Sequence, residues 1–159
     1  MSLTSLARKP DRTLREPREL VAHGLARAAD LADLEKVAAR YAVAVTPHIA
    51  GLIDPDDPAD PIARQFIPTV AELVSRRGEH ADPIGDDAHS PVGGIVHRYP
   101  DRVLFKLVHV CAVYCRFCFR REMVGPGKDN ALSDAAYHSA LHYIRAHKEI
   151  WEVILTGGD

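Results

Sequence analysis

The sequence lacks any run of about 18 apolar residues, the length that a membrane-spanning helix requires. Its first stretch, MSLTSLARKPDRTLREPREL, also lacks the apolar segment of a secretory signal. Neither sign of charge is in excess, because 20 Lys and Arg are set against 22 Asp and Glu, and the basic residues are scattered. These absences predict a cytoplasmic protein with neither a membrane nor a nucleic acid as its partner.

Cysteine is absent outside one short segment, CAVYCRFCFRRE, where it occurs at positions 111, 115 and 118. An odd number of thiols in a reducing compartment favours metal binding or catalysis over a disulfide framework. The chain as a whole has 159 residues, of which 47% are hydrophobic and 6% aromatic. That composition is typical of a soluble globular domain that can bury a core.

The first part of the chain is expected to be helical after a flexible lead-in over residues 1–16. Helical periodicity and capping residues predict helices from Pro17 to about Arg27, from Leu31 to Val43 behind the cap Asp30, and from Pro47 behind the cap Thr46. A loop over residues 54–61 and two short helical turns follow, the second capped by Thr69. Residues 76–96 are rich in Gly, Pro, Asp and His, and we expect them to form an extended connector.

The last part of the chain has the pattern of a βαβ unit. A β-prone run, VLFKLVHV at residues 103–110, ends at the first cysteine, Ser133 can cap a helix, and WEVILT is a second strand. The two strands should be parallel, and two parallel strands cannot cover themselves. We therefore expect the front part of a larger α/β protein, with a helical region and its connectors over residues 17–96 and a first βαβ unit over residues 97–159.

The cysteine spacing suggests one inorganic centre. Thiolates on a loop after a strand can converge on an iron-sulfur cluster, and three ligands on a four-iron cube leave one iron open, as catalytic metal sites do. The alternative is a zinc site of the three cysteines and His109. Structural zinc sites, however, usually present their ligands as two separated pairs. A lone histidine such as His97 or His109 is more often a polar surface or core group than a ligand.

The segment CAVYCRFC resembles the C-x3-C-x-aromatic-C motif of the radical S-adenosylmethionine (SAM) enzymes, and its surroundings resemble the lysine 2,3-aminomutase family. The supporting stretches are VTPHIAGLIDPDDPADPIARQFIPT, DDAHSPVGGIVHRYPDRVL, CFRR and LTGGD, from about residue 43 to the end. The resemblance implies a helical N-terminal region followed by the start of a partial, TIM-like (β/α) barrel, incomplete in this chain. The site would lie at the C-terminal ends of the barrel strands.

The resemblance also implies the cofactor sites. Cys111, Cys115 and Cys118 would hold a [4Fe-4S] cluster, and SAM would chelate the open iron. Phe117 would lie beside the adenine of SAM. The turn at the chain's end would contact the methionine amino group through three residues: Gly157, Gly158 and Asp159.

Pyridoxal phosphate is the third cofactor that the resemblance implies. Its phosphate would be held by Arg98 and Arg102, because guanidinium groups suit phosphate. Arg120 would pair with the carboxylate of the substrate. The lysine that binds pyridoxal phosphate lies beyond residue 159 in this family, so no residue is assigned that role.

The implied activity is that of an isomerase that moves the 2-amino group of L-lysine to C3 and gives β-lysine. A cytoplasmic electron donor such as flavodoxin or ferredoxin would reduce the cluster. Phe119 resembles the residue at this position in the branch of the family that makes β-lysine for elongation factor P. A role in that pathway is one alternative function. Another is an inactive iron-sulfur-binding fragment, because the fragment alone is not expected to be competent. The oligomeric state is left open, a homo-oligomer included.

Overall fold

The computed structural model describes residues 10–158, which fold into two compact units. The first, here called the helical unit, contains the chain up to Arg77 together with Ala112–Cys118. The second, the sheet unit, contains Gly78–Cys111 and the chain from Phe119 onward. The segment between Cys111 and Phe119 is therefore part of the helical unit, although the sequence pattern joins it to the strand before it.

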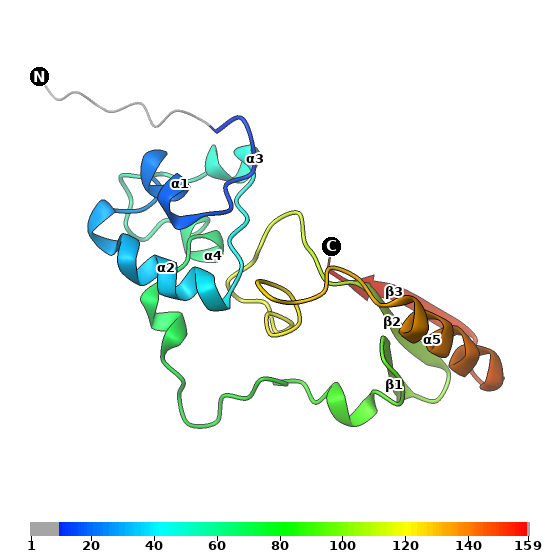
Figure 1. Ribbon diagram of the computed structural model, residues 1–159. Coiled ribbons are helices and arrows are strands. Elements are labelled where there is room, and N and C mark those ends of the chain that lie inside the picture. The colour runs from blue at the N-terminus through cyan, green and yellow to red at the C-terminus, as the bar shows by residue number, and fades with distance from the viewer. Residues whose placement is uncertain (1–9, 159) are drawn as a thin grey trace, which may run out of the picture. The chain divides into compact units, whose positions relative to one another are not determined.

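The helical unit is built from short helices, shown in blue to green in Figure 1. They are α1 (Pro17–Ala22), the 3-10 helix η1 (Ala28–Asp30), α2 (Leu31–Arg40), α3 (Pro47–Ala50), α4 (Ala63–Phe66) and the 3-10 helix η2 (Val70–Leu73). Their apolar faces enclose a small core whose buried members are Leu14, Leu20, Val43, Val45 and Ala50.

Two of the predicted caps are confirmed in this unit. The Thr46 hydroxyl accepts a hydrogen bond from the Ile49 amide at 3.4 Å, so it caps α3. Thr69 and Glu72 form a reciprocal capping box at η2, in which each side chain accepts from the other's backbone. Asp30 is the exception, because its carboxylate accepts two hydrogen bonds from the Arg27 guanidinium, at 2.7 and 2.8 Å, and does not cap α2.

Three predicted boundaries in this unit were wrong. Helix α2 ends at Arg40 and not at Val43, because Tyr41 already has an extended backbone with φ −124° and ψ 129°. Helix α1 stops at Ala22 and not near Arg27, because Gly24 takes a φ of +72° and ends the helix in a left-handed turn. Residues 1–9 of the expected flexible lead-in lie outside the described residues, but its later part is ordered. Leu14 is 2% exposed and exchanges backbone hydrogen bonds with Val45 at 2.9 and 3.0 Å, because its apolar side chain fills the core.

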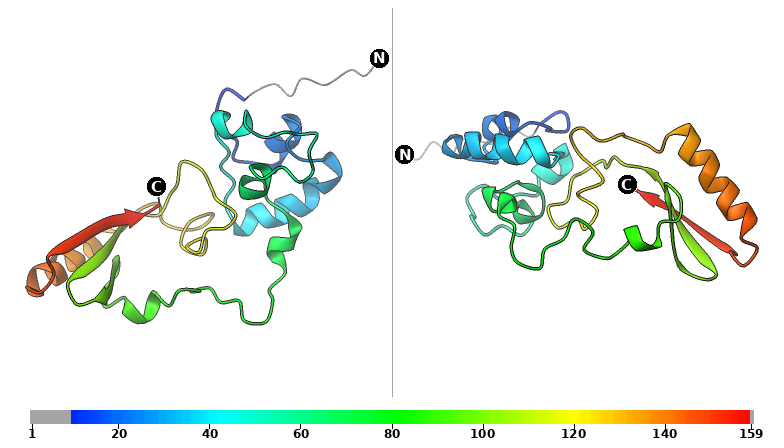
Figure 2. Two further views of the ribbon diagram at one scale, coloured as in Figure 1. Left: turned by 180° about the vertical axis from the view of Figure 1, so that it is seen from behind. Right: turned by 60° about the horizontal axis from the view of Figure 1, so that its bottom comes forward.

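The sheet unit contains three strands, a helix and the 3-10 helix η3 (Asp87–His89). The strands are β1 (Ile95–Tyr99), β2 (Arg102–Val108) and β3 (Glu152–Gly157), in the order β1-β2-β3. Strands β2 and β3 are parallel, as the sequence predicted, and Figure 2 shows them side by side with β3 in red. Helix α5 (Asp134–Ala146) connects them.

Strand β1 was not predicted. Its residues fall at the end of the expected connector and in HRYPDR, yet it pairs antiparallel with β2, with Ile95 opposite Phe105. The expected start of the βαβ region at residue 97 lies inside this strand. Pro100 and Asp101 make the tight turn between the two strands, a role for which both residue types are suited.

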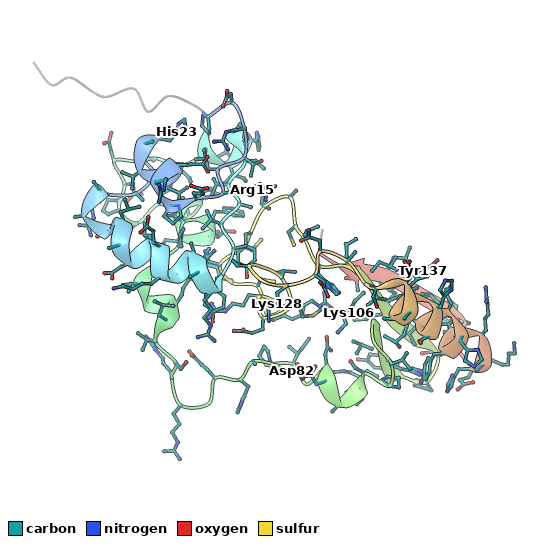
Figure 3. All side chains as sticks on the ribbon, viewed as in Figure 1. Arg15, His23, Asp82, Lys106, Lys128 and Tyr137 are labelled. Atoms are coloured by element: carbon teal, nitrogen blue, oxygen red, sulfur yellow. The ribbon has the colours of Figure 1, made fainter. Side chains whose placement is uncertain are left out.

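Helix α5 covers one face of the sheet because alternate residues of β2 point toward it. Val103 and Phe105 are buried against Ala140 of α5, and Tyr137, labelled in Figure 3, stacks on Phe105 with 5.8 Å between ring centroids. The predicted cap is confirmed, since the Ser133 hydroxyl accepts from the Ala136 amide. The described residues are thus a mixed α/β structure. No helix among residues 10–158 is long and apolar enough to cross a membrane.

Candidate functional site

Residues 111–122, here called the cysteine loop, follow β2 and contain neither helix nor strand. None of its three thiols is in a disulfide; Cys115 is exposed, while Cys111 and Cys118 are half-buried. Within residues 10–158, no group of three or more His, Cys, Asp or Glu side chains is placed to hold a metal ion. The three cysteines are therefore unbridged side chains on an irregular loop, and the proposed ligand set stays a prediction.

The backbone of this loop is tied to the helical unit on both sides of Cys115. The Tyr114 amide donates to the Ala44 carbonyl at 3.0 Å, and the Arg116 amide donates to the Gln65 carbonyl at 2.8 Å. The Tyr114 side chain is only 4% exposed. These contacts explain why Ala112–Cys118 belongs to the helical unit.

Arg116 is the most strongly anchored side chain of the loop. Its Nε and Nη2 donate to the two carboxylate oxygens of Glu72 at 3.0 and 2.5 Å, and its Nη1 donates to the Ala42 carbonyl at 2.7 Å. The guanidinium also lies over the Tyr114 ring, 5.1 Å from its centroid. The two side chains of this ion pair are 4% and 11% exposed, so water screens it weakly.

Gly157 and Gly158 lie where β3 ends beside β2. The Gly158 amide donates to the Val108 carbonyl at 2.6 Å. Gly157 has a φ of +135°, and a Cβ there would lie 2.0 Å from the Val108 carbonyl oxygen; a Cβ on Gly158 would lie 1.8 Å from the Val110 oxygen. Only glycine fits this close backbone approach. Asp159, the third predicted residue of this turn, lies outside the described residues.

Phe117 has 76% of its surface exposed, so it is not a packing residue of this structure. An exposed aromatic ring on a loop offers a flat apolar face to a ligand. The contact of this ring with adenine stays a prediction.

Arg98 and Arg102 both have anionic partners within the chain. Arg98 donates to the Ile84 carbonyl at 2.6 Å and to Asp86 at 3.3 Å. Arg102 makes a two-pronged contact with Asp101, with both distances 3.0 Å. The hydrogen bond from Arg102, followed by one from the Trp151 indole, lowers the pKa of Asp101 to about 2.

Arg102 also lies at the N-terminal end of β2, while the cysteine loop and Gly157 follow the C-terminal ends of β2 and β3. The seven residues of β2 separate these ends by roughly 20 Å at strand geometry. Arg102 therefore lies at the end of β2 opposite to the one that leads into the cysteine loop.

Arg120 lines a cavity of about 200 Å³ in the sheet unit. Its Nη1 donates to the Thr156 hydroxyl at 3.4 Å, and its Nε is buried without a hydrogen-bond partner among residues 10–158. Lys106, which is 8% exposed, lines the same cavity together with Asp82; both are labelled in Figure 3. A buried N–H donor without a partner favours an anionic or carbonyl ligand.

Neither histidine near the loop is placed as a fourth ligand. His109 contacts the Asp129 carbonyl at 3.3 Å through Nδ1. His97 Nδ1 lies 2.7 Å from the Tyr143 hydroxyl, on the side of the sheet that α5 covers. The described positions therefore give these two side chains structural contacts.

Sequence reasoning missed two charged side chains, Arg116 and Lys106. Arg116 could have been noticed because it stands between two of the cysteines, but nothing in the sequence pairs it with Glu72, 44 positions away. Lys106 could have been noticed because a charge interrupts the β-prone run VLFKLVHV.

No protein-family model matches the chain. Comparison with curated proteins gives relatives named L-lysine 2,3-aminomutase: 43% identical over 117 residues in Clostridium subterminale and 41% over 118 residues in Bacillus subtilis. A protein named glutamate 2,3-aminomutase from Clostridioides difficile is 40% identical over 126 residues. These matches cover 74%, 72% and 79% of this chain, but only 28%, 24% and 29% of the relatives.

The chain thus spans about a quarter of the length of the relatives it matches. Over the matched three quarters of its length, the chain belongs to the lysine 2,3-aminomutase family.

Proposed function

We propose that this chain supplies the iron-sulfur and SAM-binding part of a radical aminomutase. Cys111, Cys115 and Cys118 hold a [4Fe-4S] cluster, and SAM occupies the iron that has no protein ligand. The observation on which this rests is that the only three cysteines of the chain are unbridged thiols on one loop, in a chain 43% identical to a lysine 2,3-aminomutase.

The donor set fits this cofactor. Thiolates are the ligands of iron-sulfur clusters, and a loop without regular structure can bring them together as the cluster binds. Phe117 is exposed and available to adenine, and Gly157 and Gly158 let the end of β3 lie close to the backbone of Val108 and Val110. When bound, the cluster and SAM supply the radical that removes a hydrogen atom from the substrate. The protein's own task is to hold the donors and to exclude water.

Arg120 is the residue of this chain that best suits a substrate carboxylate. Its buried Nε has no hydrogen-bond partner among the described residues, and the cavity that it lines is of a size for a small molecule. A carboxylate that accepts from this guanidinium would be held by a charge-assisted hydrogen bond.

Arg98 and Arg102 are the residues that the family resemblance assigns to the phosphate of pyridoxal phosphate. Both are engaged by carboxylates, and Arg102 lies at the end of β2 opposite to the cysteine loop. Binding of pyridoxal phosphate therefore stays a prediction from the family resemblance, and no step is assigned to it here.

The substrate proposed for the whole enzyme is L-lysine, which would be converted to β-lysine, with a role in modification of elongation factor P as the alternative. Glutamate is a further candidate, because a relative named for it is as similar as those named for lysine. The charges of the cavity do not decide between the two substrates, because its lining contains four carboxylates besides the cations Lys106 and Arg120. A flavodoxin or ferredoxin is the proposed electron donor.

The test is anaerobic reconstitution of the chain with iron and sulfide, reduction, and measurement of methionine and 5'-deoxyadenosine formed from SAM. We expect both products from the unaltered chain and from His109→Ala. Neither should form with Cys115→Ser, because the cluster then loses one of its three protein ligands. Cleavage by Cys115→Ser at the unaltered rate, or no cleavage by the unaltered chain, would contradict the proposal.

A further inference from the structure

The buried ion pair of Arg116 and Glu72 is not explained by its contribution to the stability of the fold. Placing two charges out of water costs free energy that their attraction barely returns, and apolar residues of similar volume often stabilise a protein as well. The pair nevertheless uses a two-pronged geometry and a third hydrogen bond to the Ala42 carbonyl. One hypothesis for why a protein keeps a buried ion pair is that the pair holds a segment in one defined conformation.

The position of Arg116 in the sequence indicates that the pair fixes the backbone around Cys115 and Cys118. It stands directly after Cys115 and two residues before Cys118. Its backbone amide is also bound, to the Gln65 carbonyl at 2.8 Å, so both its main chain and its side chain are held. A residue anchored at both places restricts the rotation of the peptide units that carry the two neighbouring thiols.

The acceptor is fixed as firmly as the donor. One oxygen of the Glu72 carboxylate accepts from the Thr69 amide at 3.0 Å as part of the capping box of η2. The Arg116 guanidinium is held from its other side by the Tyr114 ring, 5.1 Å away, and Tyr114 is itself bound to Ala44 through its amide. The contact therefore links the cysteine loop to an element with a defined place in the helical unit.

From this arrangement we infer that Arg116 and Glu72 are a positioning pair, which sets the orientation of the Cys115 and Cys118 thiolates toward the cluster. The inference rests on the proposed function, because it requires that these thiols bind the cluster. It assigns the helical unit a role in the iron-sulfur site, carried out by side chains that touch neither cluster nor substrate.

The test compares Glu72→Gln with Glu35→Gln after reconstitution of the chain. Glu35 is the matched control, since it makes a more exposed ion pair with Arg18 in the same unit, at 3.3 Å. The readouts are the rate at which iron is lost to a chelator and the electron paramagnetic resonance spectrum of the reduced cluster with and without SAM. Removing a group that holds a metal ligand in place typically weakens metal binding roughly 10- to 100-fold.

We expect Glu72→Gln to lose iron about tenfold faster than the unaltered chain, the lower end of that range, and to show a smaller spectral response to SAM. Glu35→Gln should behave like the unaltered chain. Equal iron retention and equal spectra for Glu72→Gln would overturn the inference while leaving the proposed function intact. An unaltered chain that takes up no iron would overturn both.

Arg116→Lys is the second variant, used without iron in case Glu72→Gln does not fold. It keeps the positive charge but cannot form the two-pronged contact. In the iron-free chain we expect faster alkylation of the half-buried Cys118 thiol, with the rate at Cys111 unchanged as an internal reference. Unchanged alkylation of Cys118 would count against the positioning role.

Discussion

Asp101 is the residue whose charge is most clearly determined by its neighbours. Its carboxylate accepts hydrogen bonds from Arg102 and from the indole of Trp151, the single tryptophan of the chain, all at 3.0 Å. These donors stabilise the charged form and lower its pKa from 3.8 to about 2. The folded state therefore gains from the charge above an ordinary carboxyl pKa of about 4. That gain is lost as the pH falls from there through about 2.

A titration followed by carbon NMR of the carboxyl groups checks this prediction. Asp101 should still be ionised at a pH of about 3, where an ordinary aspartate is mostly protonated. Arg102→Gln should move its midpoint upward, because the first-named cause of the lowered pKa is removed. A midpoint near 4 in the unaltered chain would show that the contacts with Arg102 and Trp151 are not kept in solution.

At the scale of elements, the stability of helix α5 depends on its N-terminal cap Ser133, which the sequence predicted. The Ser133 hydroxyl accepts from the Ala136 amide and satisfies one of the donors left free at a helix N-terminus. Ser133→Ala should lower the free energy of unfolding by about 1 kcal/mol, as measured by urea denaturation. Ser139→Ala in the interior of the same helix is the control and should cost nothing, since alanine favours helix more than serine does. A loss at Ser139 as large as that at Ser133 would argue against capping.

Elements whose signals are local were predicted well from the sequence. The caps Thr46, Thr69 and Ser133 act on backbone groups within three residues. The strands β2 and β3 could be predicted because each is a short apolar run in the sequence. Strand β1 was missed because only Ile95 and Val96 of its five residues are buried and because it lies among turn-forming residues, so its formation depends on pairing with β2. The contact of Leu14 with Val45 was missed for the same reason.

The candidate site shows the same division. The three cysteines and the two glycines could be proposed from the sequence because their spacing and residue types are themselves the signal. The anchoring of Arg116 by Glu72 was not found, because an ion pair between distant positions leaves no periodicity in the sequence. The partners of Arg98 and Arg102 were likewise beyond sequence reasoning, since they depend on how the turn and the strands bring the side chains together.

At the scale of the whole molecule, the sheet unit is the part whose core is least complete. Strand β3 exposes Ile154 and Leu155, which are 40% and 66% accessible, whereas parallel sheets normally bury both faces. The barrel expected from the resemblance would remove this exposure, because further strands and helices would then cover β3. The barrel expected from the resemblance remains a prediction on this basis.

The central claim, that the three thiols hold an iron-sulfur cluster with one open iron, is tested most directly by Mössbauer spectroscopy of the chain reconstituted with 57Fe, alongside metal analysis. The account predicts about four iron atoms per chain in one cluster, one of which changes its spectrum when SAM is added. Stoichiometric zinc bound by all three thiols, with no iron acquired, would contradict it.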